Sequence, residues 1–306
     1  MATHVSPDAD AIGSLLALGI ILRRLNVPRT LLSEDGLPYE ADSLPGASEV
    51  VAAPPPSFDV AVLVDCPELE RIGGAAERLS GVTLVNVDHH PTNSHFGHIN
   101  LVDTDSLSTT QILHRLVGVL GLDLTADLAA CLLAGLVADT QGFRIPASDR
   151  RALRTAEALM AAGASLWEAN HSIFGSRPRG HVVLWGQVLS GAVMEGELVW
   201  STIPLSVRHA SEVPEGEDAG IVNFLLATRG TRAAAVFSER SDGSVDVSLR
   251  SQPGIDVAEV AAAFGGGGHR QAAGCTVSGG LAEVSGQVLA RLRRAVNESA
   301  VRSSVS

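Results

Sequence analysis

The chain has 306 residues, 45% of them hydrophobic and 18% charged, so it can bury a sizeable core, and its length predicts two domains. Its formal net charge of −12 argues against a protein that grips long duplex nucleic acid, because affinity for phosphate comes mostly from Lys and Arg. The three cysteines are scattered, and the longest apolar run, residues 128–138, is shorter than the roughly 20 residues that cross a bilayer. We therefore expect a soluble, cytoplasmic protein without a leader or a membrane segment.

The first part of the chain alternates helix and strand signals, which is typical of a parallel sheet with crossover helices. Two short apolar runs, Val60–Asp65 and Val82–Asp88, predict strands covered on both faces, and each ends at an aspartate. Helices are predicted at residues 11–25, 107–120, 126–138 and 150–162, with Ser106 expected to cap the second and Ser148 or Asp149 the last. The fold class is therefore α/β, with a mostly parallel sheet and helices on both of its faces.

The pattern changes to hairpins after a weak, exposed connection at residues 175–180. Strands are predicted at residues 191–194 and 198–203 around Glu195-Gly196-Glu197, and at residues 232–239 and 244–250 around Asp242-Gly243. A helix follows at residues 257–264, and the tail from Ser299 is expected to fray. We expect a catalytic domain at residues 1–178 and a smaller mixed α+β substrate-binding domain at residues 179–306, with a cleft between them.

Acidic and histidine residues gather at the ends of the predicted elements. They are His4, Asp8 and Asp10 before the first helix, Asp65 and Asp88-His89-His90 after two strands, and Asp139 at the end of a helix. Carboxylates and imidazoles without thiolates suit Mn²⁺, Mg²⁺ or a related ion, and ligands of such sheets gather beyond the carboxyl ends of the strands. Any one of these residues could be a helix cap, a turn former or a core histidine. Together the four segments predict a two-metal site.

A family resemblance rests on five motifs. The chain carries, in order, H-V-S-P-D-A-D-A-I-G-S, V-D-C, V-D-H-H-P-T-N, A-D-T-Q-G-F and F-G-G-G-G-H-R-Q-A-A-G. This set resembles the DHH phosphoesterase superfamily with its DHH-associated C-terminal domain, and above all the nanoRNase and 3′-phosphoadenosine 5′-phosphate (pAp) phosphatase group. The resemblance implies a homodimeric, manganese-dependent hydrolase, with Mg²⁺ or Co²⁺ as alternatives, that cleaves short oligoribonucleotides, linear dinucleotides or pAp.

The resemblance also implies a role for each motif residue. One metal would be held by His4, Asp8 and Asp65, and the other by Asp10, Asp65, His89 and Asp139, with Asp65 bridging them. The catalytic group would be Asp65, His90 and Asp88, of which Asp88 would orient a metal-binding histidine and His90 would face the substrate phosphate. The substrate would be bound by His90, Asn93, Arg250, Ser251, Gly266, Gly267, Gly268 and His269, with the glycines forming an anion-binding nest.

Simpler interpretations stay open for several of these residues. Asn93 and Ser108 could equally make local capping bonds, Arg250 could form a surface ion pair, and the glycine run could be a flexible turn. Family members also have an apolar strand before the first histidine, whereas only three residues precede His4. A strand clipped in this way would leave the first metal weakly held.

Four other functions were weighed against the main hypothesis. A pyrophosphatase of the superfamily is disfavoured by the glycine run ending in His269, and a RecJ-like exonuclease by the acidic charge and modest length. A cyclic di-AMP phosphodiesterase shares the motifs and remains an alternative. A catalytically silent nucleotide-binding protein is disfavoured because every expected ligand is present.

Overall fold

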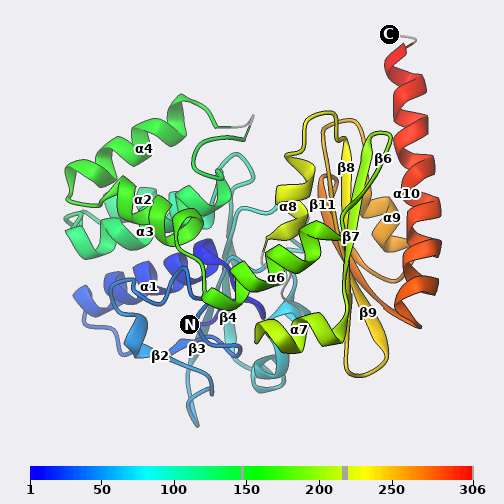
Figure 1. Ribbon diagram of the computed structural model, residues 1–306. Coiled ribbons are helices and arrows are strands. Elements are labelled where there is room, and N and C mark those ends of the chain that lie inside the picture. The colour runs from blue at the N-terminus through cyan, green and yellow to red at the C-terminus, as the bar shows by residue number, and fades with distance from the viewer. Residues whose placement is uncertain (146–147, 216–219, 305–306) are drawn as a thin grey trace. The chain divides into compact units, whose positions relative to one another are not determined.

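The computed structural model describes residues 1–145, 148–215 and 220–304. The chain divides into two compact units, Met1–Ser176 and Arg177–Ser306 (Figure 1). Each unit has its own sheet and its own hydrophobic core. The sequence-based boundary lies between residues 178 and 179, next to the junction of these units.

The N-terminal unit is built on parallel strands. They are β1 (Leu31–Leu32), β2 (Val50–Val51), β3 (Val60–Val64), β4 (Thr83–Asp88) and β5 (Ile99–Val102). β3, β4 and β5 pair in that order, β1 pairs with β2, and all of these pairings are parallel. Ala2 bridges both Leu32 and Leu63, so the first residues of the chain lie between the two sheets. The predicted parallel sheet is confirmed.

Helices and 3-10 turns cover both faces of this sheet. They are α1 (Ala9–Arg24), η1 (Ala47–Glu49), η2 (Leu69–Arg78), α2 (Thr109–Val119), α3 (Ala126–Asp139), α4 (Arg150–Ala161), α5 (Leu166–Asn170) and the π-helical turn η3 (His171–Gly175). On one face, apolar residues of α1, α2 and α3 pack with Val64 and Val87. On the other face, Ile72 and Ala75 of η2 pack with Leu63.

The helix caps follow from short polar side chains. Of the two predicted caps of α4, Asp149 is the one observed, because its carboxylate accepts hydrogen bonds from Arg151 N and Ala152 N. The predicted cap of α2 was wrong by two residues: Ser108 accepts from Gln111 N, whereas Ser106 Oγ donates to Asp103 Oδ2. Ser108 is therefore a cap, the simpler of its two interpretations.

The C-terminal unit is built on a six-stranded sheet with the order β10-β11-β9-β8-β7-β6. Its strands are β6 (Val193–Glu195), β7 (Leu198–Ile203), β8 (Ala233–Glu239), β9 (Ser244–Ser251), β10 (Gly267–His269) and β11 (Ala272–Ser278). β7 and β8 are parallel, and the other neighbours are antiparallel. Both predicted hairpins are confirmed, and Gly243 has the positive φ of 82° that its turn requires.

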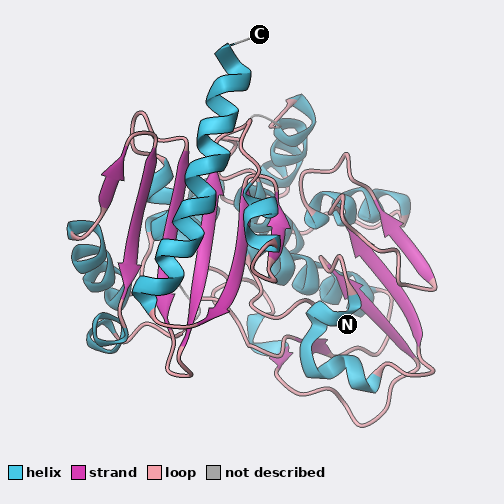
Figure 2. Cartoon of the chain, turned by 90° about the vertical axis from the view of Figure 1, so that its right-hand side faces the viewer, coloured by secondary structure: helices cyan, strands magenta, loops and turns pink. Residues whose placement is uncertain are grey.

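Helices lie on both faces of this second sheet (Figures 1 and 2). α6 (Arg179–Ser190), α7 (Leu205–Ser211) and α8 (Ile221–Leu226) cover one face, and α9 (Val257–Ala262) and α10 (Leu281–Ser304) cover the other. The predicted fraying of the tail from Ser299 was wrong, because α10 continues to Ser304. Arg232 Nη2 donates to Ser299 Oγ at 2.7 Å, which ties this helix to the sheet.

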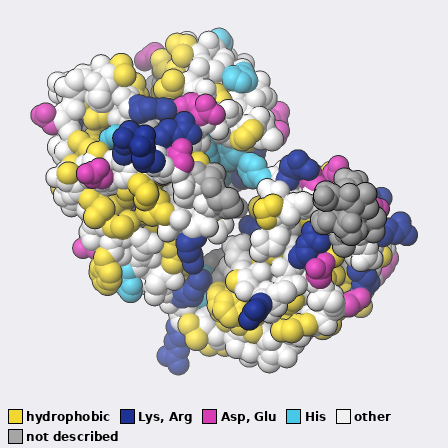
Figure 3. Space-filling view, turned by 90° about the horizontal axis from the view of Figure 1, so that it is seen from above, with side chains coloured by type: hydrophobic (Ala, Val, Ile, Leu, Met, Phe, Trp, Pro, Cys, Tyr) yellow, Lys and Arg dark blue, Asp and Glu magenta, His cyan; other side chains and the backbone are white. Residues whose placement is uncertain are grey.

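Figure 3 shows how charged side chains are distributed over one side of the molecule. On the side seen in Figure 3, arginine side chains lie in separate groups, interspersed with acidic and apolar ones. In the part of the chain that the structure describes, none of the helices combines the length and apolar character needed to cross a membrane.

Candidate metal centre

Asp65 lies at the centre of a cluster of histidines and carboxylates in the N-terminal unit. It directly follows β3 and adopts a left-handed backbone conformation, with φ of 56°, which Asp and Asn tolerate better than most side chains. Its side chain is buried. Its Oδ2 lies 3.7 Å from His4 Nε2, and its Oδ1 lies 3.7 Å from His89 Nε2.

One group of metal-ligand atoms joins Asp65 to the N-terminal segment. His4, Asp8 and Asp65 each offer an atom, and these atoms all lie within 4.8 Å of one another. The Nδ1 of His4 contacts Val5 O at 2.8 Å, which turns Nε2 toward Asp65. Asp8 also caps α1 through Oδ1, so the helix start fixes its carboxylate. His4 is buried, and its neighbour Thr3 donates to Val64 O, a bond that holds this segment beside β3.

The second group comes from three different elements. Asp10 in α1, His89 after β4 and Asp139 at the end of α3 offer atoms that lie within 4.8 Å of one another. His89 Nε2 lies 3.1 Å from Asp139 Oδ2, and its Nδ1 lies 3.4 Å from Ser106 O. The two groups together contain the six side chains predicted to bind metal, from four segments of the chain.

The start of α2 orients two of these carboxylates, a feature that the sequence analysis missed. Thr109 N and Thr110 N donate to the two oxygens of Asp10 at 2.6 and 3.1 Å, and Thr110 Oγ1 donates at 2.8 Å. Thr109 Oγ1 donates to Asp65 Oδ1 at 2.9 Å. These threonines are 99 and 100 residues from Asp10, and Thr109 is 44 residues from Asp65, so no local motif could reveal the contacts. Only the Ser-Thr-Thr run indicated a helix start.

A glycine makes room for Asp10. Gly135 lies in α3, where an added Cβ would overlap Asp10 Oδ1 and lie 2.6 Å from Thr110 Oγ1. Gly13 in α1 has a similar function, because its Cβ would lie 2.6 Å from Cys131 O. These two glycines allow α1 and α3 to approach closely beside the cluster.

Asp88 and Asn93 have different partners from those expected. Asp88 Oδ1 accepts from His90 Nδ1 at 2.8 Å, so it orients His90 and not one of the predicted metal-binding histidines. Asn93 is buried and donates to Asp88 Oδ2 at 2.6 Å and to Asn86 Oδ1 at 2.7 Å. Its Oδ1 accepts from His95 N. Asn93 thus makes the local bonds of its simpler interpretation, and its amide holds Asp88 in the position from which Asp88 contacts His90.

Crowding of charge shifts the titration of the cluster. Burial and repulsion from Asp139 and Asp65 raise the pKa of Asp10 well above its usual range. Burial raises the pKa of Asp139 to about 6, although His89 opposes this. Burial alone would lower the pKa of His89, but the hydrogen bond and the charge of Asp139 outweigh this effect, so the net result is a raised pKa. Burial likewise raises the pKa of Asp65, but His4, His89 and His90 hold it below its usual range. Divalent ions would offset the repulsion among these crowded carboxylates.

We expect the metal-free protein to lose stability as the pH rises. In the folded state the pKa values of Asp10, Asp139 and His89 are all raised, so the folded protein binds more protons than the unfolded chain. This stabilisation is complete at low pH. The contribution of Asp139 is lost between about pH 4 and pH 6. The contributions of Asp10 and His89 are lost as the pH rises through their own raised pKa values. Chelator-stripped protein should melt a few °C lower at pH 8 than at pH 6, since 1 kcal/mol shifts Tm by about 2–4 °C.

Calorimetry on stripped and Mn²⁺-loaded protein at both pH values checks this expectation. Metal must displace the retained protons, so Mn²⁺ should raise Tm more at pH 8 than at pH 6. The Asp10→Asn variant, which removes one of the repelling charges, should show a weaker pH dependence of the stripped protein. A stripped wild-type protein that melts higher at pH 8 would contradict the assignment.

The predicted substrate residues of the C-terminal unit lie around one end of β9. Arg250 is half-buried, and its Nε donates to Asn223 Oδ1 at 3.1 Å. Ser251 is buried, and its hydroxyl donates to Ile255 O at 2.8 Å, so its expected substrate contact is not what the side chain makes. His269 is exposed on the edge strand β10.

The glycine run has two structural functions. Gly265, with φ of 78°, ends α9, as the sequence predicted. Gly267 and Gly268 then pair with Gly274 and Ala273 of β11, so part of the run is a strand. Gly268 approaches β11 so closely that a Cβ would lie 2.5 Å from Ala272 O. Gly266 is similarly crowded, whereas Gly267 faces open space.

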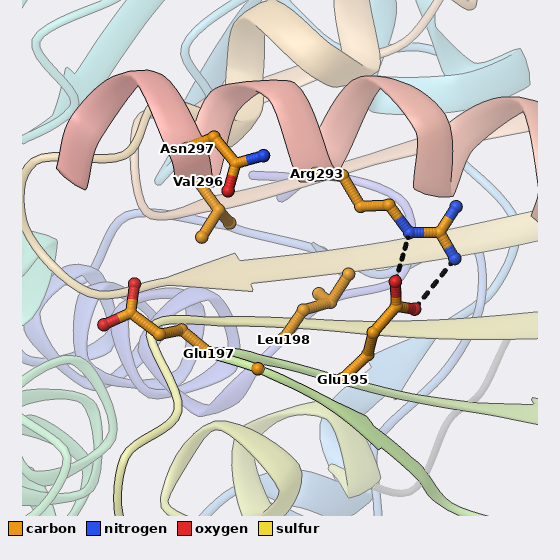
Figure 4. A pocket seen from close by; sticks show the side chains of 7 residues that line it. Glu195, Glu197, Leu198, Arg293, Val296 and Asn297 are labelled. Carbon is orange, nitrogen blue, oxygen red and sulfur yellow. Dashed lines mark hydrogen bonds and ion pairs between the residues drawn. The ribbon is translucent and has the colours of Figure 1, made fainter. Parts of the chain in front are cut away.

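A pocket in the same unit lies apart from all of these residues (Figure 4). It lies between the β6–β7 hairpin and α10, and Arg293 makes a two-point ion pair with Glu195 along its wall, at 2.9 and 2.8 Å. It contains none of the predicted site residues. This pocket is therefore not a candidate active site.

Comparison with known proteins gives matches to both units. Residues 1–136 match the profile of the DHH family, N-terminal domain, and residues 203–300 match the DHHA1 domain. The chain is 32% identical over 286 residues to the bifunctional oligoribonuclease and PAP phosphatase NrnA of Thermus thermophilus, covering 91% of this chain and 84% of that protein. It is 26% identical over 289 residues to the protein of the same name from Bacillus subtilis, covering 90% and 87%.

Solved structures share the fold. An exopolyphosphatase-related protein from Bacteroides fragilis superposes with a TM-score of 0.87 at 22% identity, over 98% of this chain and 92% of that chain. RecJ from Thermus thermophilus, in complex with Mn²⁺, superposes with a TM-score of 0.54 at 19% identity, over 97% of this chain and 52% of that chain. At these identities the likeness concerns the fold alone.

Proposed function

This chain belongs to the DHH family of phosphoesterases and carries its DHHA1 domain, and from that premise we propose that it hydrolyses short oligoribonucleotides, linear dinucleotides of the pApA type and pAp. The observation that carries the proposal is that six ligand-type side chains, Asp65 among them, form two groups whose ligand atoms lie within 4.8 Å of one another in each group. The relative from Thermus thermophilus, an oligoribonuclease and PAP phosphatase by name, covers both units of this chain and supports the substrate class.

We propose that the cluster holds two divalent ions, with Mn²⁺ preferred because imidazoles join the carboxylates. His4, Asp8 and Asp65 would hold one, and Asp10, Asp65, His89 and Asp139 the other. When bound, such ions supply positive charge for phosphoryl oxygens and a nucleophilic water at neutral pH. The metal-free carboxylates would repel a phosphate, so substrate binding should depend on metal loading.

Two further side chains would act on the phosphate directly. His90 donates through Nδ1 to Asp88, so its Nε2 is the atom through which it would contact a phosphoryl oxygen. Asp88 fixes the orientation of the ring, so that Nε2 can donate a hydrogen bond to that oxygen and stabilise the charge that develops on it. Asn93 is a positioning residue in this arrangement, because it holds the other oxygen of Asp88.

We assign substrate binding to the C-terminal domain, with residues 1–178 as the catalytic domain and residues 179–306 as the substrate domain. Arg250 and His269 are its candidate phosphate ligands, together with the backbone of Gly266, Gly267 and Gly268. Arg250 is supported by the bond from its Nε to Asn223, which fixes the plane of its guanidinium group.

Replacement of Arg250 by Ala is expected to raise KM for pApA by roughly tenfold or more with a smaller change in kcat, because a charge-assisted bond contributes about 1.5–3 kcal/mol to binding. Steady-state kinetics checks this. Arg229→Ala, an exposed arginine of the same unit, is the matched control. Unchanged constants for Arg250→Ala would remove this residue from the site.

The proposed activity is tested by product chromatography. Chelator-stripped protein is given Mn²⁺ and offered pApA, cyclic di-AMP, pAp and pyrophosphate in parallel. Cleavage of pApA or pAp, but not of pyrophosphate, is expected. Preferential cleavage of cyclic di-AMP would favour the cyclic-dinucleotide alternative, and binding without any cleavage would favour the silent nucleotide-binding protein. Replacing Mn²⁺ by Mg²⁺ or Co²⁺ tests the preferred metal.

We also propose a cytoplasmic homodimer, on family likeness. The three cysteines, Cys66, Cys131 and Cys275, are buried and free, which suits a reducing compartment. Burial raises the pKa of Cys66 and of Cys131 to about 12, so these thiols are protonated and unreactive at neutral pH. Light scattering on the purified protein measures the oligomeric state.

A further inference from the structure

Phe224 is an aromatic side chain with half of its surface exposed. It lies in α8, whose apolar residues Ile221, Val222 and Leu225 are buried against the sheet, whereas Phe224 is 51% exposed. A single exposed apolar residue needs no explanation by itself. What distinguishes Phe224 is the set of contacts that fixes its ring.

The ring of Phe224 is supported by Trp185 of α6. Their centroids lie 5.0 Å apart with the planes inclined at 56°, and Trp185 packs in turn on the core between the helices and the sheet. The guanidinium group of Arg177 lies 4.6 Å from the centre of the Trp185 ring. Phe224 is therefore part of a packed stack of side chains, so its exposed surface loses little conformational freedom when a ligand covers it.

The same turn of α8 also positions a phosphate ligand. Asn223, the residue before Phe224, is exposed and accepts from Arg250 Nε at 3.1 Å. Asn223 thus holds the guanidinium group of Arg250, and the next residue, Phe224, presents an aromatic ring. A nucleotide carries the matching pair of groups, a flat aromatic base and a phosphate, in one small molecule.

We infer that Phe224, supported by Trp185, is a stacking platform for a nucleobase of the substrate whose phosphate Arg250 binds. This inference rests on the proposed function and adds a base subsite to it. Stacking accepts every base, because each has a π-face, and it is stronger for the larger purines. The subsite would therefore favour purine nucleotides without recognising a particular base sequence in the substrate.

Calorimetric titration of the Mn²⁺-loaded full chain tests the subsite, with AMP and ribose 5-phosphate as the two ligands. Phe224→Ala should weaken AMP binding by about tenfold, since stacking on an aromatic side chain is worth about 1–3 kcal/mol per base. It should leave ribose 5-phosphate, which has no base, unchanged. Arg250→Ala should weaken both ligands, because both carry the phosphate.

Three control variants separate stacking from simple apolar cover. Phe224→Trp keeps an aromatic face and should retain AMP binding, whereas Phe224→Leu is apolar without one and should not. Met194→Ala removes a side chain of the same unit that is 70% exposed and should change neither ligand. AMP should also quench the fluorescence of Trp185, and Trp185→Phe should remove that quench.

The outcomes distinguish this inference from the proposed function. Unchanged AMP binding in Phe224→Ala, an equal loss for both ligands, full binding by Phe224→Leu, or no AMP binding by the wild type would each overturn the base subsite. If the protein cleaves pApA and Phe224→Ala behaves like the wild type, only the subsite fails. If no substrate is cleaved but Phe224→Ala loses AMP binding and keeps ribose 5-phosphate binding, the subsite stands and the hydrolase proposal fails.

Discussion

Replacement of Asp65 by Asn is expected to abolish hydrolysis and to prevent the protein from holding two metal ions. Asp65 offers an oxygen to the group with His4 and Asp8 and to a further group with His89 and His90. His4 and His89 approach opposite oxygens of its carboxylate. Loss of a residue that merely orients a metal ligand costs about 10–100-fold, so loss of a shared ligand should cost at least about a thousandfold in kcat/KM. Kinetics and metal analysis of the dialysed protein provide the measurements.

Asn is the informative substitution because the backbone at this position is unusual. Asp65 has φ of 56°, a conformation that Asn adopts readily and Ala does not, so Asp65→Asn should preserve the turn while removing the charge. Asp105→Asn, an exposed aspartate of the same unit, is the matched control and should remain active. Retention of activity by a folded Asp65→Asn protein would refute the two-metal assignment.

Replacement of Gly135 by Ala is expected to damage the site from within α3. The new methyl group would overlap Asp10 Oδ1 and crowd Thr110, so Asp10 must leave the position in which three donors hold it. Overpacking of this kind typically costs about 1–3 kcal/mol of stability. We expect a lower Tm, loss of metal from the group of Asp10, His89 and Asp139, and a decrease in activity of roughly 100-fold or more.

The matched control for Gly135→Ala is a second glycine within a helix of the same unit. Gly118 in α2 has open space at its Cβ position, so Gly118→Ala should be neutral or stabilising by up to about 1 kcal/mol through helix propensity. Differential scanning calorimetry and metal analysis on both variants separate the two expectations. Normal metal content in Gly135→Ala would show that Asp10 tolerates displacement and is not needed as a ligand.

The strands and helices that carry the site could be predicted because their signals are local. Apolar runs ending in aspartate gave β3 and β4, a regular helical pattern gave α3, and Asp242-Gly243 gave the β8–β9 hairpin. The helices α6, α7, α8 and α10 were not predicted. α7 and α8 are only 7 and 6 residues long, and such helices depend on packing against the sheet more than on their own sequence.

Individual side-chain roles were less predictable than the motifs that contain them. Asp88 was expected to orient a metal-binding histidine, but in the structure it bonds to His90, because the ring of His89 turns its Nδ1 toward Ser106 O. Asn93 and Ser251 were expected at the substrate and are buried with other partners. A motif fixes which residue types are present, whereas the direction of a side chain depends on neighbours from elsewhere in the chain.

The sequence by itself determined the class of chemistry. Parallel strands place their carboxyl ends at one edge of a sheet, so acidic residues at those ends must come close together, whatever the details of packing. Only the tertiary structure decided how the cluster is held, because its supports are distant in sequence: Thr109 and Thr110 orient Asp10 from about a hundred residues away, and Gly135 makes room for it. Such contacts arise when helices pack, and packing leaves no periodic pattern that a reader of the sequence could recognise.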